Sequence, residues 1–573
     1  MGHDYSFYLP SLLDGYFWHQ INGLWKIPWF TPSFCGGSLN YININNGYYT
    51  VPQFITFFTD PLTAVRFTFL LFAGLGLSGF YLLLRRAFFT SQTISFLGAG
   101  LFMFNGFYAH RMLIGHLFLH SFMLLPFIAF ILLRPLPEEK KGRHWQFVFD
   151  IVIGGFLFAY MVQSGFSSFM IPGIISIVVA GLIHGLLFGK QCHFLIRWVG
   201  SGFVGILLCS SKLVAIFSLM ESFPRSGYKL PGARSFFEAA WLMLKSLFIS
   251  PAFDPCRIEK LTNVQWHLGR HEWEYSVTFI PLIIMLYGGW KILQQIEKKD
   301  LGLKLSRIRW LSVAAITALL ILPVALNTFS PGWNTFLKQL PLLKNLSNLI
   351  RWVIIYIPIV ILAATLILEK IAISSKYKMG IIVISMAAVI ALNALTERDF
   401  YHSQNYDPEE IIKTYNLVKE GLWMPEITNI GVYLNKNGQT IMPLFRNNML
   451  IHGASQLLCY EPLFGYRLED FPIKSLHPGP AMEENKGVLN IKNPSCYVWP
   501  EVNNCEPGDH FTVEQKEAAK TFLNFRHFPF QMPTSQRIAN WINGLSLIAA
   551  LFFLTLYGAR ALIAYRRMSP FES

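Results

Sequence analysis

Long apolar stretches separated by short polar segments fill most of this chain. Eleven of these stretches are long enough to cross the roughly 30 Å hydrocarbon core of a bilayer as helices. A soluble enzyme of comparable length does not contain so many, so the pattern predicts a polytopic α-helical membrane protein. The expected spans lie near 63–84, 93–109, 117–134, 146–163, 167–189, 194–219, 275–293, 310–328, 352–368, 379–395 and 541–563.

Residues 1–61 differ from the apolar stretches that follow them. This segment holds sixteen aromatic residues, yet it is too polar and too often broken by Pro and Gly to cross a bilayer. Its aromatic residues exceed what an interfacial belt requires. We expect a folded extracytoplasmic loop, made of short turns and amphipathic pieces, that lies over a membrane-embedded cavity.

Residues 396–538 interrupt the apolar pattern a second time. Their charged fraction rises and turn residues multiply, which predicts a small soluble α/β domain. A helix is expected after Asp407, a hairpin turn at Asn437-Gly438, and a second helix after a capping box that begins at Thr512. The predicted parts are therefore a first loop at 1–61, a bundle of ten spans at 62–395, this domain at 396–538, and a final span with a tail at 539–573.

The basic excess of the chain is an orientation signal. The chain has 47 Lys and Arg against 33 Asp and Glu, a formal net charge of +14. If residues 1–61 lie outside, seventeen basic residues fall in the inward loops and three in the short outward loops, as the positive-inside rule requires. This topology places the loop 220–274 and the domain 396–538 outside and the C-terminus in the cytoplasm. It also removes the reason to invoke a nucleic-acid partner.

Cysteine positions fit the same topology. Five of the seven cysteines fall outside the membrane on this arrangement. Cys496 and Cys505 enclose a short loop containing Pro and Asn, which suits a disulfide bond in an oxidising compartment. Two unpaired thiols are the alternative.

Several ionisable residues lie where the predicted helices meet the outer membrane surface. Arg111 and His116 follow the second span, and Arg351 opens the ninth. Each is either an interfacial residue with its polar edge in water or a group that faces a substrate. Lys212 lies deeper, inside the sixth span, where it either reaches back to the surface or pairs with Glu221 or a ligand phosphate.

The outward loop 220–274 supplies a second group of candidates. Arg225 and Tyr228 belong to a basic and aromatic turn directly above the membrane. Such a turn is either a solvated loop or a contact for a lipid phosphate. Residues 235–248 predict an amphipathic helix that lies in the outer interface. The chain contains no Walker loop, no dinucleotide-binding glycine motif and no zinc-protease motif.

The order of these parts resembles a known family. An aspartate opens the first loop, and LPSLLDG and PWFTPSFCGG follow it. Then come DPLTAVRFTFLLFAGLGLSGFYLLLRR, the FNGFYAH…GH…LP segment, KLVAIFSLMESFPRSGY, Arg351 at a helix mouth and a late soluble domain. The chain resembles the integral-membrane glycosyltransferases of the GT-C superfamily, most of all the bacterial YfhO-like branch. The likeness covers most of residues 2–370 and is specific at the level of the superfamily.

The resemblance implies an activity. Members of the superfamily typically transfer a sugar from a polyprenyl-phosphate-linked donor to an acceptor on the outer face of the membrane. For this chain the acceptor would be a glycan, a lipid or a protein, and the membrane would be the bacterial inner membrane. No metal site is predicted, although a need for a divalent cation is left open.

The resemblance also assigns roles to particular residues. Asp4 occupies the position of the first-loop acid, which would act as general base on the acceptor hydroxyl, with Asp14 and Asp60 as alternatives. His116 and Tyr228 would contact the substrates. Positive charge would stabilise the leaving phosphate; the candidates are Arg225, Arg351, Lys212 and Arg111.

Two further classes of protein stay open. A transporter or flippase of a lipid-linked saccharide would use the same basic groups without needing Asp4, although no repeat of broken spans is present. A non-catalytic membrane scaffold or assembly partner would use the late domain to bind protein. The family pattern also places a span before the acidic residue, so we expect the natural product to start upstream and to include a twelfth span.

Overall fold

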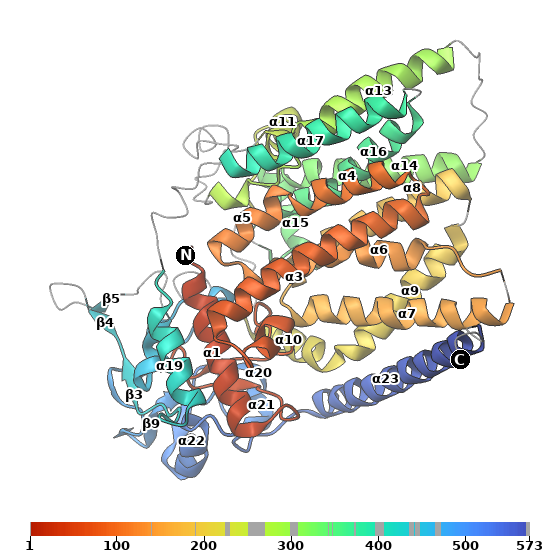
Figure 1. The fold of residues 1–573 in the computed structure, drawn as a ribbon. Coiled ribbons are helices and arrows are strands. Elements are labelled where there is room, and N and C mark those ends of the chain that lie inside the picture. The colour runs from red at the N-terminus through yellow and green to blue at the C-terminus, as the bar shows by residue number, and fades with distance from the viewer. Residues whose placement is uncertain are drawn as a thin grey trace.

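The computed structural model of this chain consists mainly of long helices that lie side by side in a bundle (Figure 1). Segments from both ends of the sequence form a smaller part beside one end of that bundle. The structure describes residues 2–138, 140–189, 191–223, 230–249, 270–297, 307–341, 343–346, 348–371, 374–395, 406–434, 440–441, 447–464 and 471–568.

The bundle is built from consecutive helices of the first and second halves of the chain. The first half contributes α3 (Pro61–Leu82), α4 (Gln92–Met103), α5 (Gly106–Ile114), η2 (Leu117–Leu124), α6 (Leu125–Leu133), α7 (Lys140–Gln163), α8 (Ser167–Phe188), α9 (Gln191–Leu208) and α10 (Ser210–Ser222). The rest of the chain contributes α11 (Phe236–Phe248), η3 (Arg270–Glu272), α13 (Ile280–Glu297), α14 (Arg307–Leu326), α15 (Pro331–Gln339), η4 (Ile350–Ile355), α16 (Tyr356–Lys370), α17 (Ser375–Leu395) and α23 (Thr534–Met568).

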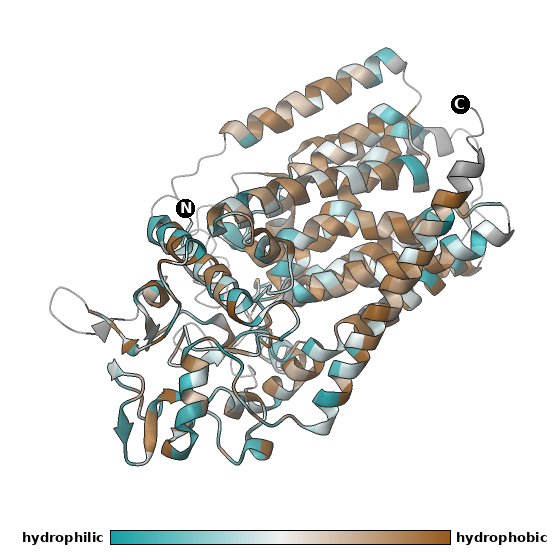
Figure 2. Cartoon of the chain, turned by 60° about the horizontal axis from the view of Figure 1, so that its bottom comes forward, coloured by the Kyte–Doolittle hydropathy of each residue, from teal (hydrophilic) through white to brown (hydrophobic). Residues whose placement is uncertain are grey.

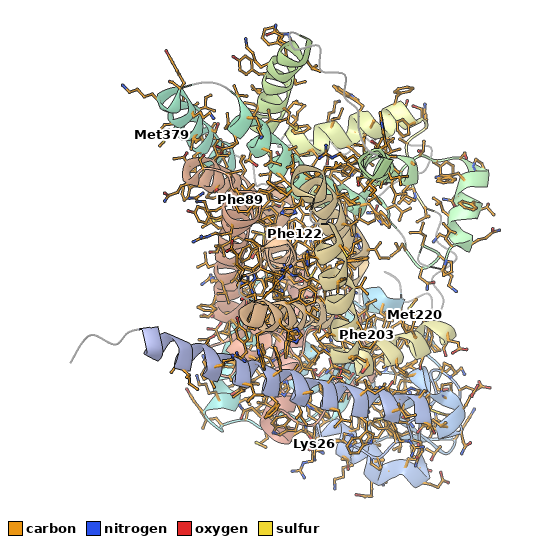
Figure 3. All side chains as sticks on the ribbon, turned by 90° about the vertical axis from the view of Figure 1, so that its right-hand side faces the viewer. Lys26, Phe89, Phe122, Phe203, Met220 and Met379 are labelled. Carbon is orange, nitrogen blue, oxygen red and sulfur yellow. A yellow bond between two sulfur atoms is a disulfide. The ribbon has the colours of Figure 1, made fainter. Side chains whose placement is uncertain are left out.

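The composition of these helices makes the chain a helical membrane protein, as the sequence predicted. Among the described residues, seven helices are long and apolar enough to cross a membrane, or eight if the bent pair α9 and α10 forms one span. Hydrophobic residues cover the bundle helices, whereas hydrophilic residues gather at helix ends and in the smaller part (Figure 2). Helix α23 crosses one side of the molecule (Figure 3) and exposes Trp541, Leu545 and Phe552, which suits a surface in lipid.

Fewer candidate spans than the eleven expected stand out among the described residues, because several of the expected stretches are bent, broken or short as helices. The stretch 93–109 is interrupted at Asn105, whose side chain accepts a hydrogen bond from the Tyr108 N–H (2.9 Å) and so begins α5. The stretch 194–219 bends by 74° between α9 and α10, and 117–134 begins with the 3-10 helix η2. Short helices and turns therefore replace straight spans at these breaks.

The first segment contains a helix where short turns were expected. Helix α1 (Tyr5–Asn22) runs through Pro10, which has no N–H to offer the carbonyl of Ser6. That carbonyl accepts instead from the Asn447 N–H (3.1 Å), a residue of the late domain. The helix continues through the proline because a distant segment satisfies the freed carbonyl. It is followed by β1 (Phe30–Thr31), β2 (Ser38–Leu39) and α2 (Val51–Ile55).

The late segment contains both helices and short strands. Its helices are α19 (Glu409–Lys419), η5 (Asn448–His452), η6 (Pro462–Phe464), α20 (Ser495–Val498), α21 (Pro500–Asn503), η7 (Val513–Gln515) and α22 (Lys516–Leu523). Its strands are β3 (Asn429–Gly431), β4 (Tyr433–Leu434), β5 (Thr440–Ile441), β6 (Ala454–Gln456), β7 (Gly479–Pro480), β8 (Glu484–Asn485), β9 (Val488–Lys492) and β10 (His510–Thr512).

The strands of this part pair in short sheets. Strand β3 lies between β6, to which it is parallel, and β7, to which it is antiparallel, and β9 lies between β8 and β10. Strands β4 and β5 pair antiparallel on either side of the expected turn at Asn437-Gly438, which lies outside the described residues. The expected capping box at Thr512 is present.

Residues 2–61 and the late segment pack as one body, although the sequence suggested two separate parts. The Lys492 N–H donates to the Gly36 carbonyl (2.7 Å), and the Asn22 side chain donates to the carbonyl of Phe525 (2.7 Å). A disulfide joins Cys35 to Cys459. This bond was not predicted, whereas the predicted disulfide between Cys496 and Cys505 is present with an S–S distance of 2.04 Å.

Candidate functional site

Asp4 lies at the start of α1, where the N-terminal segment packs against the end of α5. Its N–H donates to the carbonyl of Ile114 (3.1 Å). The next residue, Gly115, ends α5 with a φ of 110°, a left-handed conformation that favours glycine. A Cβ atom at Gly115 would overlap the backbone nitrogen of Tyr5. This close approach sets the Asp4 carboxylate beside His116, which follows the turn.

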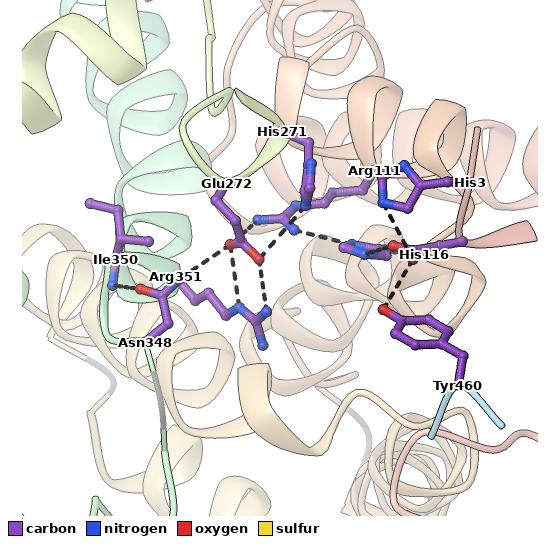
Figure 4. A network of polar contacts seen from close by, with 10 residues as sticks. His3, Arg111, His116, His271, Glu272, Asn348, Ile350, Arg351 and Tyr460 are labelled. Carbon is purple, nitrogen blue, oxygen red and sulfur yellow. Dashed lines mark hydrogen bonds and ion pairs between the residues drawn. The ribbon is translucent and has the colours of Figure 1, made fainter. Parts of the chain in front are cut away.

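Asp4 is the first member of a continuous chain of polar contacts, whose other members, His116, Arg111, Glu272 and Arg351, are labelled in Figure 4. Asp4 Oδ2 lies 2.5 Å from His116 Nε2, and His116 Nδ1 lies 3.1 Å from Nη1 of Arg111. Arg111 Nη2 lies 2.6 Å from Glu272 Oε2. Glu272 Oε1 in turn lies 2.7 Å from Arg351 Nη2. The sequence had indicated four of these residues separately: Asp4, His116, Arg111 and Arg351. The structure shows that they are connected, and that the connection runs through Glu272, which the sequence analysis did not identify.

Further polar side chains flank the carboxylates of this chain of contacts. They are Tyr460 and His3 beside Asp4 Oδ1 (3.3 and 3.5 Å), and Asn348 and His271 beside Glu272 (3.4 and 3.9 Å). The hydroxyl of Tyr460 donates to Asp4 and comes from the late segment. The late domain therefore contributes a side chain to the candidate site.

The contacts fix the protonation of His116. An arginine side chain has only N–H donors, so Nδ1 of His116 must accept from Arg111. The single proton of the neutral ring is then on Nε2, from which it donates to Asp4. Burial lowers the pKa of His116 and outweighs the opposite effect of the nearby Asp4 carboxylate. The imidazole is therefore neutral at neutral pH.

Both carboxylates of the chain of contacts are ionised. Burial by itself raises the pKa of Asp4, but the contact with His116, together with the nearby His3 and His271, outweighs burial and lowers this pKa to about 2. Burial alone would also raise the pKa of Glu272. The positive charges of Arg111 and Arg351 outweigh this effect, so the pKa of Glu272 lies well below its usual range. Two carboxylates and two guanidinium groups thus alternate along the chain of contacts, and their charges cancel.

Arg111 and Arg351 differ in what they can reach. Arg111 is fully buried, with its guanidinium 5.6 Å from the ring of Phe107. It has no surface to offer a ligand phosphate, and it positions His116 and Glu272 instead. The Arg351 side chain is 21% exposed and lies over the ring of Phe169 (5.4 Å). Arg351 is therefore the cation of this group that a phosphate can approach.

The alternative carboxylates Asp14 and Asp60 hold other partners. Asp14 is buried and accepts hydrogen bonds from four side chains: Thr31, Ser33, Asn40 and Tyr48. Asp60 is the N-cap of α3 and accepts from the N–H groups of Leu62 (2.9 Å) and Thr63 (3.0 Å). Both carboxylates stabilise local structure, and neither contributes to the chain of contacts that starts at Asp4.

Lys212 has a role that the sequence did not suggest. Its Nζ donates to the backbone carbonyls of Asn46 (2.8 Å) and Gln163 (3.3 Å) and lies 5.6 Å from the ring of Tyr41. It neither reaches back to the surface nor pairs with Glu221. The buried amine instead ties the first segment to α7 and α10. Arg225 and Tyr228 lie outside the described residues, so the structure places neither of them.

The sequence contained a signal for one of the missed residues. Glu272 and Glu274 stand in the segment HEWEY, directly before a predicted span, and two acids at the outer end of a helix favour a polar site. Tyr460 had no such signal, since only the packing of the late domain brings it to Asp4. In the described part of the chain, no group of three His, Cys, Asp or Glu residues is arranged to hold a metal ion.

Comparisons with protein-family models, with curated proteins and with solved structures find no match to this chain.

Proposed function

We propose that this protein is a membrane glycosyltransferase, which moves a sugar from a polyprenyl-phosphate-linked donor to an acceptor hydroxyl on the extracytoplasmic face. One observation carries the proposal: the first-loop carboxylate Asp4 and the helix-mouth cation Arg351 belong to one chain of contacts. Transfer from a lipid phosphate needs a carboxylate for the acceptor proton and a cation for the leaving phosphate. The sugar itself is suggested by the GT-C-like motifs.

Asp4 acts as the general base in this mechanism. His116 donates to Oδ2 at 2.5 Å, whereas Tyr460 approaches Oδ1 at 3.3 Å, so Oδ1 is the oxygen that an acceptor hydroxyl can contact. A carboxylate with a pKa of about 2 is a weak base. The acceptor oxygen, however, becomes strongly acidic once its bond to the sugar carbon starts to form. A late proton transfer therefore suits Asp4.

Arg351 receives the phosphate of the departing lipid. Arg351 and Glu272 form an ion pair and neutralise each other. A phosphate that binds Arg351 competes with Glu272, which keeps the fully buried Arg111 as its partner. The cost of parting Arg351 from Glu272 is therefore smaller than it would be for an isolated buried ion pair.

The proposal includes an orientation of the protein in the membrane. Helix α1, which Asp4 precedes, and the late domain lie at one end of the bundle, and the turns from α3 to α4 and from α6 to α7, which carry or adjoin Arg85, Arg86, Arg134 and Arg143, lie at the other (Figure 1). The positive-inside rule then places the site on the outer face of a bacterial inner membrane and the C-terminus in the cytoplasm. A GT-C-like arrangement of the spans accompanies this orientation.

The test replaces the proposed base without changing its shape. We expect Asp4→Asn to lower sugar transfer from a panel of polyprenyl-phosphate-linked hexoses by about 100-fold or more, measured in proteoliposomes with labelled sugar. The control Asp407→Asn changes an exposed carboxylate of the late domain and should leave transfer intact. Unchanged transfer by Asp4→Asn would contradict the proposal. Movement of the intact saccharide-lipid across the bilayer, unaffected by Asp4→Asn, would indicate a flippase.

A further inference from the structure

A basic cavity lies at the end of the bundle opposite Asp4. Its volume is about 400 Å³, within the range of small-molecule sites. The ends of α6 and α8 and the beginnings of α7 and α9 surround it. The polar residues that line it are Arg134, Arg143, Arg197, His184, His193 and Glu138.

The inner wall of this cavity carries more positive than negative charge. Arg197, which is 2% exposed, and Arg134 both contact the carboxylate of Asp150. Two guanidinium groups thus share one buried carboxylate, which leaves one positive charge unneutralised. Nη1 of Arg197 donates to the carbonyls of Ile131, Leu132 and Arg134 at 2.8 to 3.3 Å. Its Nε has no hydrogen-bond partner among the residues that the structure describes.

The mouth of the cavity adds three exposed ionisable side chains, those of Arg143, His193 and Glu138, so the lining as a whole keeps a net positive charge. Arg143 Nη2 lies 3.1 Å from Nε2 of His193, and both side chains are exposed. The Arg134 side chain in the wall is 23% exposed, so a ligand in the cavity can reach it as well as Arg143. Guanidinium groups arranged in this way bind phosphate oxygens through charge-assisted hydrogen bonds.

An apolar rim accompanies the basic groups. Phe89, labelled in Figure 3, is 58% exposed and lies with its ring centroid 5.5 Å from that of Phe188. The backbone of Phe89 has a φ of 58°, a left-handed conformation that is costly for a bulky side chain. The fold therefore holds an aromatic ring at the rim against its local preference. A lipid acyl chain can pack along such an apolar rim, whereas a free inorganic anion would gain no contact from it.

We infer that this cavity binds the phosphate headgroup of an anionic phospholipid from the inner leaflet. The headgroup enters between Arg143 and Arg134, with the buried Arg197 behind them, and its acyl chains follow Phe89 and Phe188. The position fits a lipid site, since the cavity lies at the membrane face that carries the excess of basic loops. The site is independent of Asp4 and of the proposed transfer reaction.

The test compares two lipids of matched acyl chains, phosphatidylglycerol and phosphatidylcholine, offered to the full-length protein in detergent and counted by native mass spectrometry. We expect selective retention of phosphatidylglycerol. The variant Arg143→Gln/His193→Gln should lower the selectivity about tenfold, the effect of losing one charge-assisted hydrogen bond. Both residues are exposed, so folding should be retained, and the thermal unfolding midpoint checks this.

The control variant is Lys376→Gln, which removes an exposed positive charge at the beginning of α17, outside the cavity. It should keep the selectivity of the wild type. Equal retention of the two lipids by the wild type, or an equal loss in Lys376→Gln, overturns the inference. Displacement of phosphatidylglycerol by millimolar inorganic phosphate would indicate a site for free anions and overturn the lipid assignment, whereas retention supports it.

Discussion

Arg111 determines the geometry of the candidate site at the scale of single residues. Its planar guanidinium donates in two directions, to His116 Nδ1 and to Glu272. A lysine has one nitrogen on a flexible stem and could not hold both partners in fixed directions. By occupying Nδ1, Arg111 leaves the imidazole proton on Nε2, where it faces Asp4. Arg111 is thus a positioning residue, not the phosphate contact that the sequence suggested.

The buried histidines of the site predict a pH dependence of stability. Burial lowers the pKa of His116 and of His271 below the value of about 6.5 expected in the unfolded chain. At a pH between the folded and the unfolded pKa of these histidines, the unfolded state binds more protons than the folded state. The free energy of unfolding that they contribute is therefore fully present above about pH 6.5 and is lost on acidification. The thermal unfolding midpoint should therefore fall between about pH 7 and pH 5. His271→Gln should make this fall smaller, and an equal fall in the variant would contradict the assignment.

The sequence indicated individual site residues but not their connection. His116, Arg111 and Arg351 were recognisable because each ionisable group lies beside the end of an apolar stretch, whereas Asp4 was suggested by the family resemblance. Glu272 links them through a segment that has no periodic pattern. Contacts between residues so far apart in the chain depend on packing, which local patterns do not encode.

At the scale of elements, α1 shows why local rules were insufficient. Pro10 and the neighbouring glycines indicated a broken segment, because a proline inside a helix leaves a carbonyl without a donor. Asn447 supplies that donor, so the helix forms only in its tertiary context. Conversely, the hydropathy of 93–109 indicated one span, and the cap at Asn105 divided it into two shorter helices.

The junction of α1 with α5 can be tested at Gly115. Gly115→Ala places a side chain in a left-handed conformation, which costs about 1 to 2 kcal/mol, and also overlaps Tyr5. Gly189→Ala is the matched control. It incurs the conformational cost without any steric overlap, because Gly189 has a φ of 71° and open space around it. We expect Gly115→Ala to lower sugar transfer about tenfold or more by displacing Asp4. Gly189→Ala should retain transfer, and equal transfer by both variants would argue against the junction.

At the scale of the whole molecule, the apolar pattern and the charge asymmetry predicted a helical membrane protein with a late α/β part. They did not reveal that the first and late segments pack together. This packing depends on contacts such as that of the Phe30 ring with the Phe528 ring, whose centroids lie 5.9 Å apart. Such pairs join aromatic residues that look alike throughout the sequence, so composition cannot select the partners.

The two disulfides should contribute unequally to stability. Cys35–Cys459 closes a loop with a sequence separation of 424, whereas the separation of Cys496–Cys505 is 9. The chain-entropy relation gives roughly 6 kcal/mol for the longer loop and roughly 3 kcal/mol for the shorter one. Membrane helices inside the longer loop already restrict the unfolded chain, which reduces the first value. The Cys35→Ser/Cys459→Ser variant should still have the lower unfolding midpoint in detergent; the reverse order would contradict this.

The joining of the first and late segments has a consequence for biosynthesis. Residues 2–61 leave the ribosome before the helices of the bundle, but the Asn447 N–H that completes α1 and the Cys459 thiol that pairs with Cys35 are synthesised only after most of those helices. The aromatic surface of the first segment is therefore exposed while the membrane helices insert. Contacts of such long range form slowly, and surfaces exposed meanwhile are prone to aggregate. Maturation of this protein is complete only when its two ends meet.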